Sequence, residues 1–297
     1  SGMYGVAYTD VVQGIILLVV IGLIIPFSAL GQIGGMDGLK ANLDESYFRF
    51  SPDIKMLGYT VTSFLYFVAG PPYWQRAFSA KSSKAATRGS LGGNIVIIFY
   101  TIAVILIGMC AAVIYPNVAA GDTEMVLLMV TEKYFPTIVY ALTVASILAV
   151  IMSTTDSYLI LSAQTVTTDI VAKLAGEIEQ KRMVLISRIS VAAVGLFAVL
   201  YALRMSNIFQ AMMLSMTQFS AGVAVPALAA LFSKRVTREG MISSMLSGLI
   251  FSVIWARVLS NPWGLSEAIS GSIVSLIVIV VVSALTQKKG KPAPFFS

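Results

Sequence analysis

The sequence predicts an all-α protein, a polytopic transmembrane bundle of about eight helices. The first observation is composition: of 297 residues, 57% are hydrophobic and only 11% are charged, and the mean hydropathy is +0.86. A soluble domain of this length could not hide so much apolar surface in its core, so the composition indicates an integral membrane protein. The second is pattern: the apolar runs show no strand-like alternation, and helices satisfy their own backbone polar groups in lipid.

Apolar runs of spanning length define the individual helices. About 20 residues, at a rise of about 1.5 Å each, cross a hydrocarbon core of about 30 Å. On this basis we expect helices over residues 5–30, 56–74, 90–115, 137–172, 184–203, 208–232, 241–258 and 267–287. We therefore predict a single transmembrane domain over residues 1–287, followed by a cytoplasmic tail over residues 288–297.

The distribution of Lys and Arg predicts the orientation of the bundle. Most of the 20 basic residues fall on one side once the helices alternate, and the positive-inside rule makes that side cytoplasmic. These residues are Arg76, Lys81, Lys84, Arg88, Lys173, Lys181, Arg182, Arg188, Lys234, Arg235, Arg238, Lys288, Lys289 and Lys291. We expect a multi-pass protein of the cell inner (plasma) membrane with the lipid bilayer as a partner. The net charge of +6 follows from this bias, so no nucleic-acid partner is expected.

Cysteine and histidine are nearly absent, which limits the disulfide, metal-binding and proton-transfer chemistry that we expect. The chain has one cysteine, Cys110, within an apolar run, so no internal disulfide is expected. It has no histidine, which argues against imidazole metal ligands and a histidine proton relay. We expect no organic cofactor.

The expected second helix is short and runs into Ala69-Gly-Pro-Pro-Tyr-Trp74. Consecutive prolines remove two amide donors, so a regular helix cannot continue through them. Broken helices in membranes usually line a cavity, although a helix end at the interface is the simpler alternative.

The expected fourth helix carries unusual polarity. The apolar stretch 147–160 includes Ser153, Thr154, Asp156 and Ser157. A central Asp costs about 2.5–3.5 kcal/mol on insertion scales, so such a residue normally faces a cavity, a partner or an ion. Ser153, Asp156 and Ser157 share one helical face, at i, i+3 and i+4. The alternatives are that the hydroxyls bond the i−4 carbonyl of their own helix and that Asp156 serves helix packing.

The first helix carries a second embedded carboxylate, Asp10, within Tyr8-Thr-Asp-Val-Val-Gln-Gly14. Asp10 and Gln13 share a helical face at i, i+3 spacing. The alternative role for Asp10 is a favourable interaction with the helix dipole in the first turn.

Three segments carry a family resemblance: 8–14, Trp74-Gln-Arg-Ala-Phe-Ser-Ala-Lys81 and Met152-Ser-Thr-Thr-Asp-Ser157. In order and spacing they resemble the signature segments of the sodium:solute symporter family, which includes sodium/proline, pantothenate, sialic acid and sodium/glucose symporters. The resemblance implies a partial LeuT-like fold of two inverted repeats. The chain would supply core helices five to ten and two following helices, and the first four core helices would be absent. We therefore expect the C-terminal portion of a longer, N-terminally truncated symporter.

The resemblance also implies ion and solute sites. It places one sodium ion at the backbone carbonyl of Val150 and the hydroxyls of Ser153 and Thr154, oxygen ligands that suit a hard cation. A possible second sodium site would combine Asp10 with Ser153, Asp156 and Ser157.

By the same resemblance, Tyr66 of the broken helix and Gln218 of the tenth core helix are expected to contact the solute. An interhelical hydrogen bond is the alternative role of Gln218.

These expectations describe a sodium-coupled secondary active transporter, a symporter that takes up a small organic solute by alternating access. Sodium is the coupling ion and no chemical step is expected, so the protein is not expected to be an enzyme. Three alternatives stay open: a proton-coupled transporter of the same fold, a membrane-embedded enzyme using Asp10 and Asp156 as paired carboxylates, and an inactive fragment. The residues do not distinguish an amino acid, vitamin, sugar or carboxylate as the solute.

Overall fold

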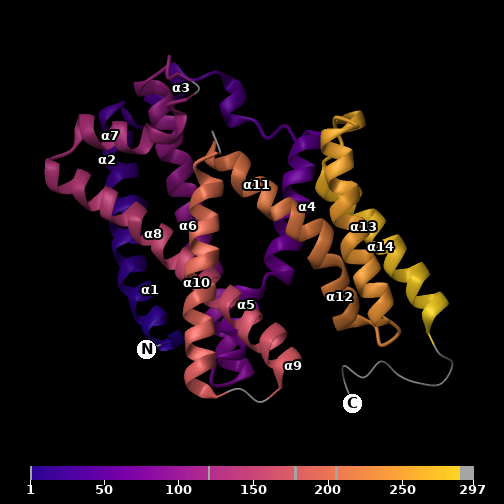
Figure 1. The fold of residues 1–297 in the computed structure, drawn as a ribbon. Helices are drawn as coiled ribbons and strands as arrows, with labels where there is room; N and C mark the ends of the chain where they lie inside the picture. Colours follow the sequence, from indigo (N-terminus) through magenta and orange to yellow (C-terminus); the bar gives the residue numbers. More distant parts are fainter. Residues whose placement is uncertain (1, 120, 177–178, 205–206, 288–297) are drawn as a thin grey trace. The chain divides into compact units, whose positions relative to one another are not determined.

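The computed structural model describes residues 2–119, 121–176, 179–204 and 207–287 (Figure 1). The described residues form helices and no strands, which confirms the predicted all-α class. Among them, seven helices are long and apolar enough to cross a membrane. These spans are Tyr8–Gln32, Ser83–Ile114, Thr137–Ala175, Gln180–Ala202, Ile208–Phe232, Arg238–Arg257 and Glu267–Thr286. The predicted tail, residues 288–297, lies outside the described residues.

The remaining expected helix, 56–74, is divided in two. Helix α4 covers Ile54–Ala69 and α5 covers Pro71–Phe78, so α4 with 16 residues is shorter than the other spans. The Asp53 side chain caps α4 by accepting a hydrogen bond from the Met56 amide at 2.7 Å. Gly70 interrupts the helix with an extended ψ of 122°. The prolines then begin α5, where a missing amide hydrogen costs nothing. The predicted break is confirmed.

Two spans contain a π-helical segment in front of a proline. Helix α1 (Gly2–Val19) continues through η1 (Val20–Ile24) into α2 (Ile25–Gln32). Helix α11 (Ile208–Phe219) continues through η5 (Ser220–Ala224) into α12 (Val225–Phe232). The proline is the second residue of α2 and of α12, and its missing amide hydrogen perturbs the ladder there. Hydropathy predicts the spans but carries no signal for these wider turns.

The chain divides into two compact units. The first unit comprises Ser1–Phe50 and Ser79–Arg204, and the second comprises Ser51–Phe78 and Met205–Ser297. The assignment of residues 1–287 to a single transmembrane domain stays a prediction.

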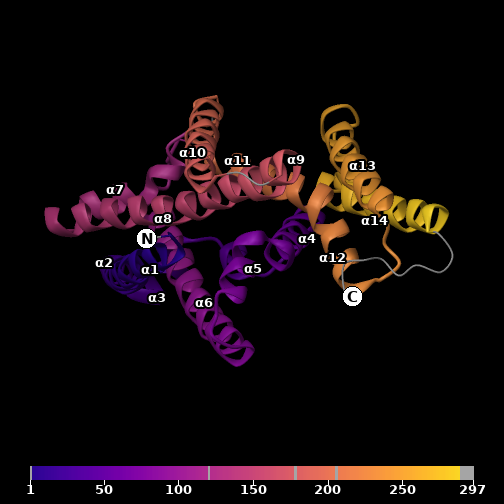
Figure 2. The same cartoon turned by 60° about the horizontal axis from the view of Figure 1, so that its bottom comes forward.

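The first unit is built around long helices. Its further elements are α3 (Gly35–Asn42), α6 (Ser83–Ile114), α7 (Val126–Tyr134), α8 (Thr137–Gln164), η4 (Thr165–Val171), α9 (Ala172–Ala175) and α10 (Gln180–Ala202). Helix α8 packs against α1 and α10 (Figure 2). One buried cluster surrounds Leu39 and Cys110, and another surrounds Ile25 and Ile107.

The second unit centres on a helical hairpin. Helices α13 (Arg238–Arg257) and α14 (Glu267–Thr286) lie side by side (Figure 1). Small residues line the surfaces that meet, which lets the backbones approach closely, as is common between membrane helices. The Ser244 and Ser275 hydroxyls lie 2.7 Å apart, and the buried Ser220 hydroxyl donates to the Thr62 carbonyl at 2.9 Å. The first contact joins α13 to α14, and the second joins η5 to α4.

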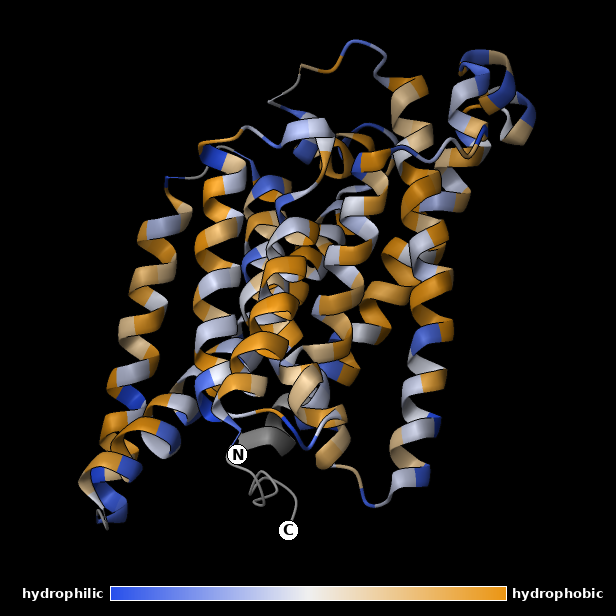
Figure 3. Ribbon diagram, turned by 90° about the vertical axis from the view of Figure 1, so that its right-hand side faces the viewer, coloured by the Kyte–Doolittle hydropathy of each residue, from blue (hydrophilic) through white to orange (hydrophobic). Residues whose placement is uncertain are grey.

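The polarity of the helices matches a lipid environment. Figure 3 shows hydrophobic residues along the helix bodies and hydrophilic residues mainly at helix ends and connections. Large apolar side chains such as Ile97, Leu196 and Val280 are 60%, 62% and 61% exposed within the described chain. In water this exposure would be unfavourable, whereas hydrocarbon solvates such side chains.

Candidate functional site

Helix α8 carries five of the six residues predicted for the sodium sites: Val150, Ser153, Thr154, Asp156 and Ser157. The helix is regular from Thr137 to Gln164. In such a helix the side chains of residues i+3 and i+4 tilt back toward the carbonyl of residue i. Ser153 and Thr154 therefore lie one turn after Val150, on the side toward which its carbonyl points. That carbonyl accepts one amide of the helical ladder and keeps a second lone pair, which a cation could use.

The hydrogen bonds of α8 separate these two hydroxyls from those of Thr143 and Ser146 on the same helix. Thr143 donates to the Val139 carbonyl at 2.8 Å, and Ser146 donates to the Leu142 carbonyl at 2.7 Å. These bonds are the usual i−4 contacts of hydroxyls in membrane helices. Within the described residues, neither Ser153 nor Thr154 donates such a bond.

Exposure also separates Ser153 and Thr154 from the hydroxyls deeper in the packing. Ser146 is fully buried, whereas Ser153 is half-buried and Thr154 is exposed in the described chain. The two hydroxyl oxygens are therefore accessible and keep their lone pairs. The two residues are adjacent in α8, one turn after the Val150 carbonyl.

Ser157 and Asp156 extend this polar face by one turn. The Ser157 hydroxyl donates to the Ser153 carbonyl at 3.1 Å, so the alternative i−4 role applies to Ser157. Its oxygen keeps lone pairs for a cation. Asp156 is exposed in the described chain.

The other embedded carboxylate, Asp10, lies on the helix that packs against α8. Helix α8 is the principal neighbour of α1 outside its own span. Asp10 is half-buried, and its Oδ1 atom is buried. The structure thus brings the two carboxylate-bearing helices together. The proposed ligand set of Asp10, Ser153, Asp156 and Ser157 stays a prediction, and the described residues contain no group of three or more His, Cys, Asp or Glu side chains placed to hold a metal.

The structure adds Gln13 to the candidate residues. Its Oε1 atom is buried and has no hydrogen-bond partner within the described part of the chain. A buried amide oxygen without a partner is unfavourable, which makes it available to a cation or a donor. The i, i+3 spacing from Asp10 was the sequence signal for this residue.

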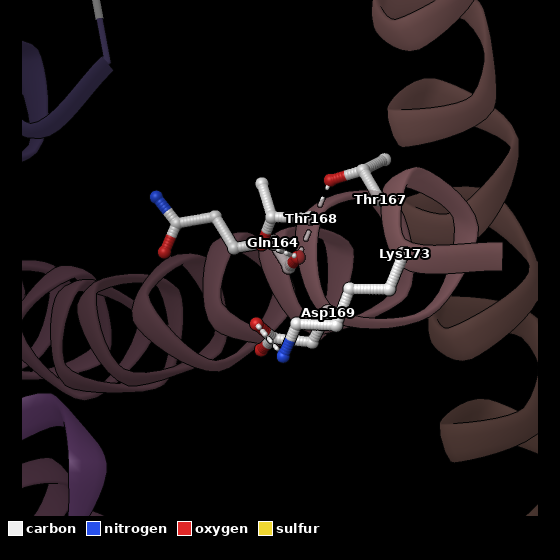
Figure 4. Close-up of polar contacts among 5 residues, drawn as sticks. All are labelled: Gln164, Thr167, Thr168, Asp169 and Lys173. Atoms are coloured by element: carbon white, nitrogen blue, oxygen red, sulfur yellow. Dashed lines mark hydrogen bonds and ion pairs between the residues drawn. The ribbon is translucent and has the colours of Figure 1, made fainter. Parts of the chain in front are cut away.

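Polar residues beyond the end of α8 behave differently (Figure 4). In η4, the Thr167 and Thr168 hydroxyls both donate to the Gln164 carbonyl, at 3.3 and 2.5 Å (Figure 4). Asp169 lies 3.8 Å from the Lys173 ammonium, and both side chains are largely exposed. Exposed pairs of this kind contribute little, about 0–1 kcal/mol. The Thr167 and Thr168 hydroxyls thus make the local contacts that are usual in membrane helices.

The predicted solute residues lie in the second unit. The Tyr66 ring packs edge-on against Phe219, with ring centroids 5.4 Å apart, so α4 and α11 meet at this aromatic pair. The Gln218 Oε1 accepts a long hydrogen bond of 3.4 Å from Ser252, which corresponds to the alternative interhelical role. The Gln218 Nε2 donates no hydrogen bond within the described residues. Both side chains are half-buried, and their contact with a solute stays a prediction.

Comparison with known proteins gives one family and several relatives. The model of the sodium:solute symporter family matches residues 1–248. A sodium/proline symporter of Staphylococcus aureus (strain bovine RF122 / ET3-1) is 29% identical over 309 residues, covering 98% of this chain and 60% of the relative. The osmoregulated proline transporter OpuE of Bacillus subtilis (strain 168) is 27% identical over 304 residues, covering 98% of this chain and 61% of the relative.

One solved structure supports the fold. It shows a Na+-coupled sialic acid symporter in a substrate-bound outward-open state, with a TM-score of 0.73 and 21% identity. The match covers 98% of this chain and 64% of that chain. The likeness confirms the expected LeuT-like architecture for the portion present. The chain spans about 60% of the length of the curated relatives it matches.

Proposed function

Because the chain belongs to the sodium:solute symporter family, we propose that it forms part of a symporter in which sodium entry drives uptake of a small organic solute. Alternating access achieves this coupling when sodium and solute favour the same conformation. A membrane potential supplies about 2.3 kcal/mol per charge for each 100 mV. No chemical step belongs to this cycle, and we propose no enzymatic activity.

The observation that carries the proposal is the pair of accessible hydroxyls on α8. Ser153 and Thr154 lie next to each other, one turn after the Val150 carbonyl, and donate no hydrogen bond within the described residues. Hydroxyl and carbonyl oxygens suit a hard cation and do not titrate near neutral pH. We assign these three oxygens to the coupling sodium ion.

A second sodium ion would draw on Asp10. Its half-buried carboxylate lies on a helix packed against α8, and Ser153, Asp156 and Ser157 share the polar face of that helix. A cation between two carboxylates offsets their mutual repulsion in a low-dielectric region. The buried Gln13 oxygen, one turn from Asp10, is a further neutral ligand for this ion.

The solute assignment starts from the relatives. The Staphylococcus and Bacillus relatives are both named for proline, so a small amino acid such as proline is the first solute to test. Tyr66 would pack against the apolar part of proline, and the Gln218 Nε2, which donates to no residue in the described part of the chain, would donate to the proline carboxylate.

One observation favours a second candidate, proton coupling. Asp10 is half-buried in an apolar span, and a carboxylate in such a place can carry a proton. The two hydroxyls on α8 cannot do so, because their protons do not leave near neutral pH.

Proteoliposomes distinguish the two candidates. Proline uptake is measured with an inward sodium gradient and no proton gradient, and then with an inward proton gradient and no sodium. We expect uptake to require sodium and to collapse in its absence even when the proton gradient is kept. Equal uptake under the proton gradient alone would refute sodium coupling and make Asp10 or Asp156 the carrier.

A further inference from the structure

The second unit contains a cavity that the sodium and solute assignments do not use. Its volume is about 560 Å³, within the range of small-molecule sites. The cavity lies where the first turns of α4 and α11 meet the turn between α13 and α14. Tyr59, Phe209 and Leu214 give it apolar walls, while Gln210 and Asn261 contribute amides.

Charged side chains of both signs line this cavity. Lys55 and Arg257 supply two cations and Glu267 supplies one anion. No ion pair joins any of the three to another residue in the part of the chain that the structure describes. A site with free charges of both signs and a net positive balance is complementary to a ligand with a carboxylate and an ammonium group.

Asn261 adds an unsatisfied acceptor to the same wall. Its Oδ1 is buried and has no hydrogen-bond partner among the described residues. Leaving a buried acceptor unpaired is costly, and a ligand N–H would satisfy it. A carboxylate cannot, because it has no proton to donate. Asn261 therefore favours an ammonium-bearing ligand over a simple anion.

The turn that holds Asn261 is strained. Ser260, Asn261 and Trp263 have left-handed φ values of 55°, 51° and 58°, which are unfavourable for residues with a Cβ. Two hydrogen bonds of Trp255 hold this conformation. The Trp255 carbonyl accepts a hydrogen bond from the Asn261 backbone amide at 3.0 Å, and the Trp255 indole donates to the Leu265 carbonyl at 2.9 Å. Strain that the surroundings enforce at a cavity wall points to a role in binding.

The cavity lies on the same helical faces as the proposed solute contacts. Tyr59 and Thr62 precede Tyr66 by seven and four residues on α4, and Gln210 and Leu214 precede Gln218 by eight and four on α11. Seven residues span about 10 Å along a helix axis. With the predicted orientation, the cavity lies on the side away from the cytoplasm, about two turns outside Tyr66.

We propose that this cavity is an outer binding site for a small zwitterion: Lys55 and Arg257 bind its carboxylate, and Asn261 Oδ1 and Glu267 accept hydrogen bonds from its ammonium group. That the transported solute binds first at this site rests on the proposed function. Binding itself does not require sodium or transport.

Tryptophan fluorescence provides the test. The chain has three tryptophans, and two of them, Trp255 and Trp263, lie at the cavity turn with ring centroids 6.1 Å apart. In purified Trp74→Phe protein, titration with proline should produce a saturable fluorescence change. Arg257→Gln should raise the half-saturating concentration at least about tenfold, because it removes a charge-assisted bond. The matched control Arg238→Gln, at the opposite end of α13, should leave it unchanged.

Two further ligands test the chemistry of the site. Propionate and propylamine each carry one of the two charges and should bind at least about tenfold more weakly than proline. Propionate binding as tightly as proline would overturn the zwitterion assignment in favour of a plain anion site.

If Trp74→Phe impairs folding, equilibrium dialysis of radiolabelled proline measures binding instead. The protein then keeps Trp74 and carries Tyr66→Ala. The proposal is refuted if proline does not bind, or if Arg257→Gln and Lys55→Gln both bind like the parent. Loss of sodium-driven uptake with unchanged fluorescence titration would refute the transport function and leave the outer site standing.

Discussion

Gly248 packs against the π-helical segment η5 with no room for a side chain, and Gly248→Ala tests whether this packing positions Gln218. A Cβ at Gly248 would lie 2.0 Å from the Ala221 carbonyl oxygen and 3.0 Å from the Ser275 Cβ. Ordinary carbon contacts lie at about 3.5–4.0 Å. The backbones of α13 and η5 would therefore have to separate by on the order of 1 Å, because neither collision is with a flexible side-chain end.

The expected cost follows from this geometry. Overpacking costs about 1–3 kcal/mol, and the backbone collision favours the upper half of that range. Alanine regains about 0.5–1 kcal/mol over glycine within a helix. We therefore expect a net loss of about 1–2 kcal/mol in the free energy of unfolding. Gln218 lies just before η5, so the KM for the solute should rise as well.

Thermal unfolding of the purified protein in detergent, together with uptake in proteoliposomes, measures both effects. The control is Gly108→Ala in α6, where a Cβ would meet no atom within 4 Å. This control should leave stability unchanged or increase it slightly. Gly248→Ala that unfolds at or above the parent's temperature would show that α13 and η5 do not pack as described.

Two further predictions concern the ion and solute sites. Asp10→Asn and Asp156→Asn should each raise the sodium concentration for half-maximal uptake. The double variant should lose less apparent sodium affinity than the two single variants lose together, because both substitutions would disrupt one site. Additive losses would assign the carboxylates to separate sites. Tyr66→Ala should raise the KM for the solute several-fold, at the scale of one lost aromatic contact, with a smaller change in sodium dependence. An unchanged KM in Gln218→Ala would favour the structural role, the hydrogen bond to Ser252.

The sequence predicted the long helices well because lipid imposes a simple rule on length and polarity. The end of α4 could be predicted because Gly70 and the two prolines interrupt the ladder. Other features lay beyond hydropathy. The eight residues of α3 and the nine of α7 lie between spans, in segments too short to reveal a period. The π-helical segments η1 and η5 depend on how each helix accommodates the proline that follows.

The candidate sodium-site residues could be predicted from the family resemblance, but their hydrogen bonding could not. The resemblance identified Ser153 and Thr154, but spacing alone could not show that they lack the i−4 bond that Ser146 makes. That difference depends on side-chain conformation and packing. The outer cavity had no sequence signal at all, because its residues, from Lys55 to Glu267, come from three stretches of sequence distant from one another.

The central claim is that the α8 hydroxyls hold the coupling sodium ion, and radiolabelled sodium binding to purified protein tests it most directly. Ser153→Ala and Thr154→Val each remove one ligand oxygen and should weaken sodium binding at least about tenfold. Ser146→Ala, which removes a buried hydroxyl of the same helix bonded to Leu142, should bind sodium like the parent. Sodium affinity that is unchanged in both Ser153→Ala and Thr154→Val would contradict the account.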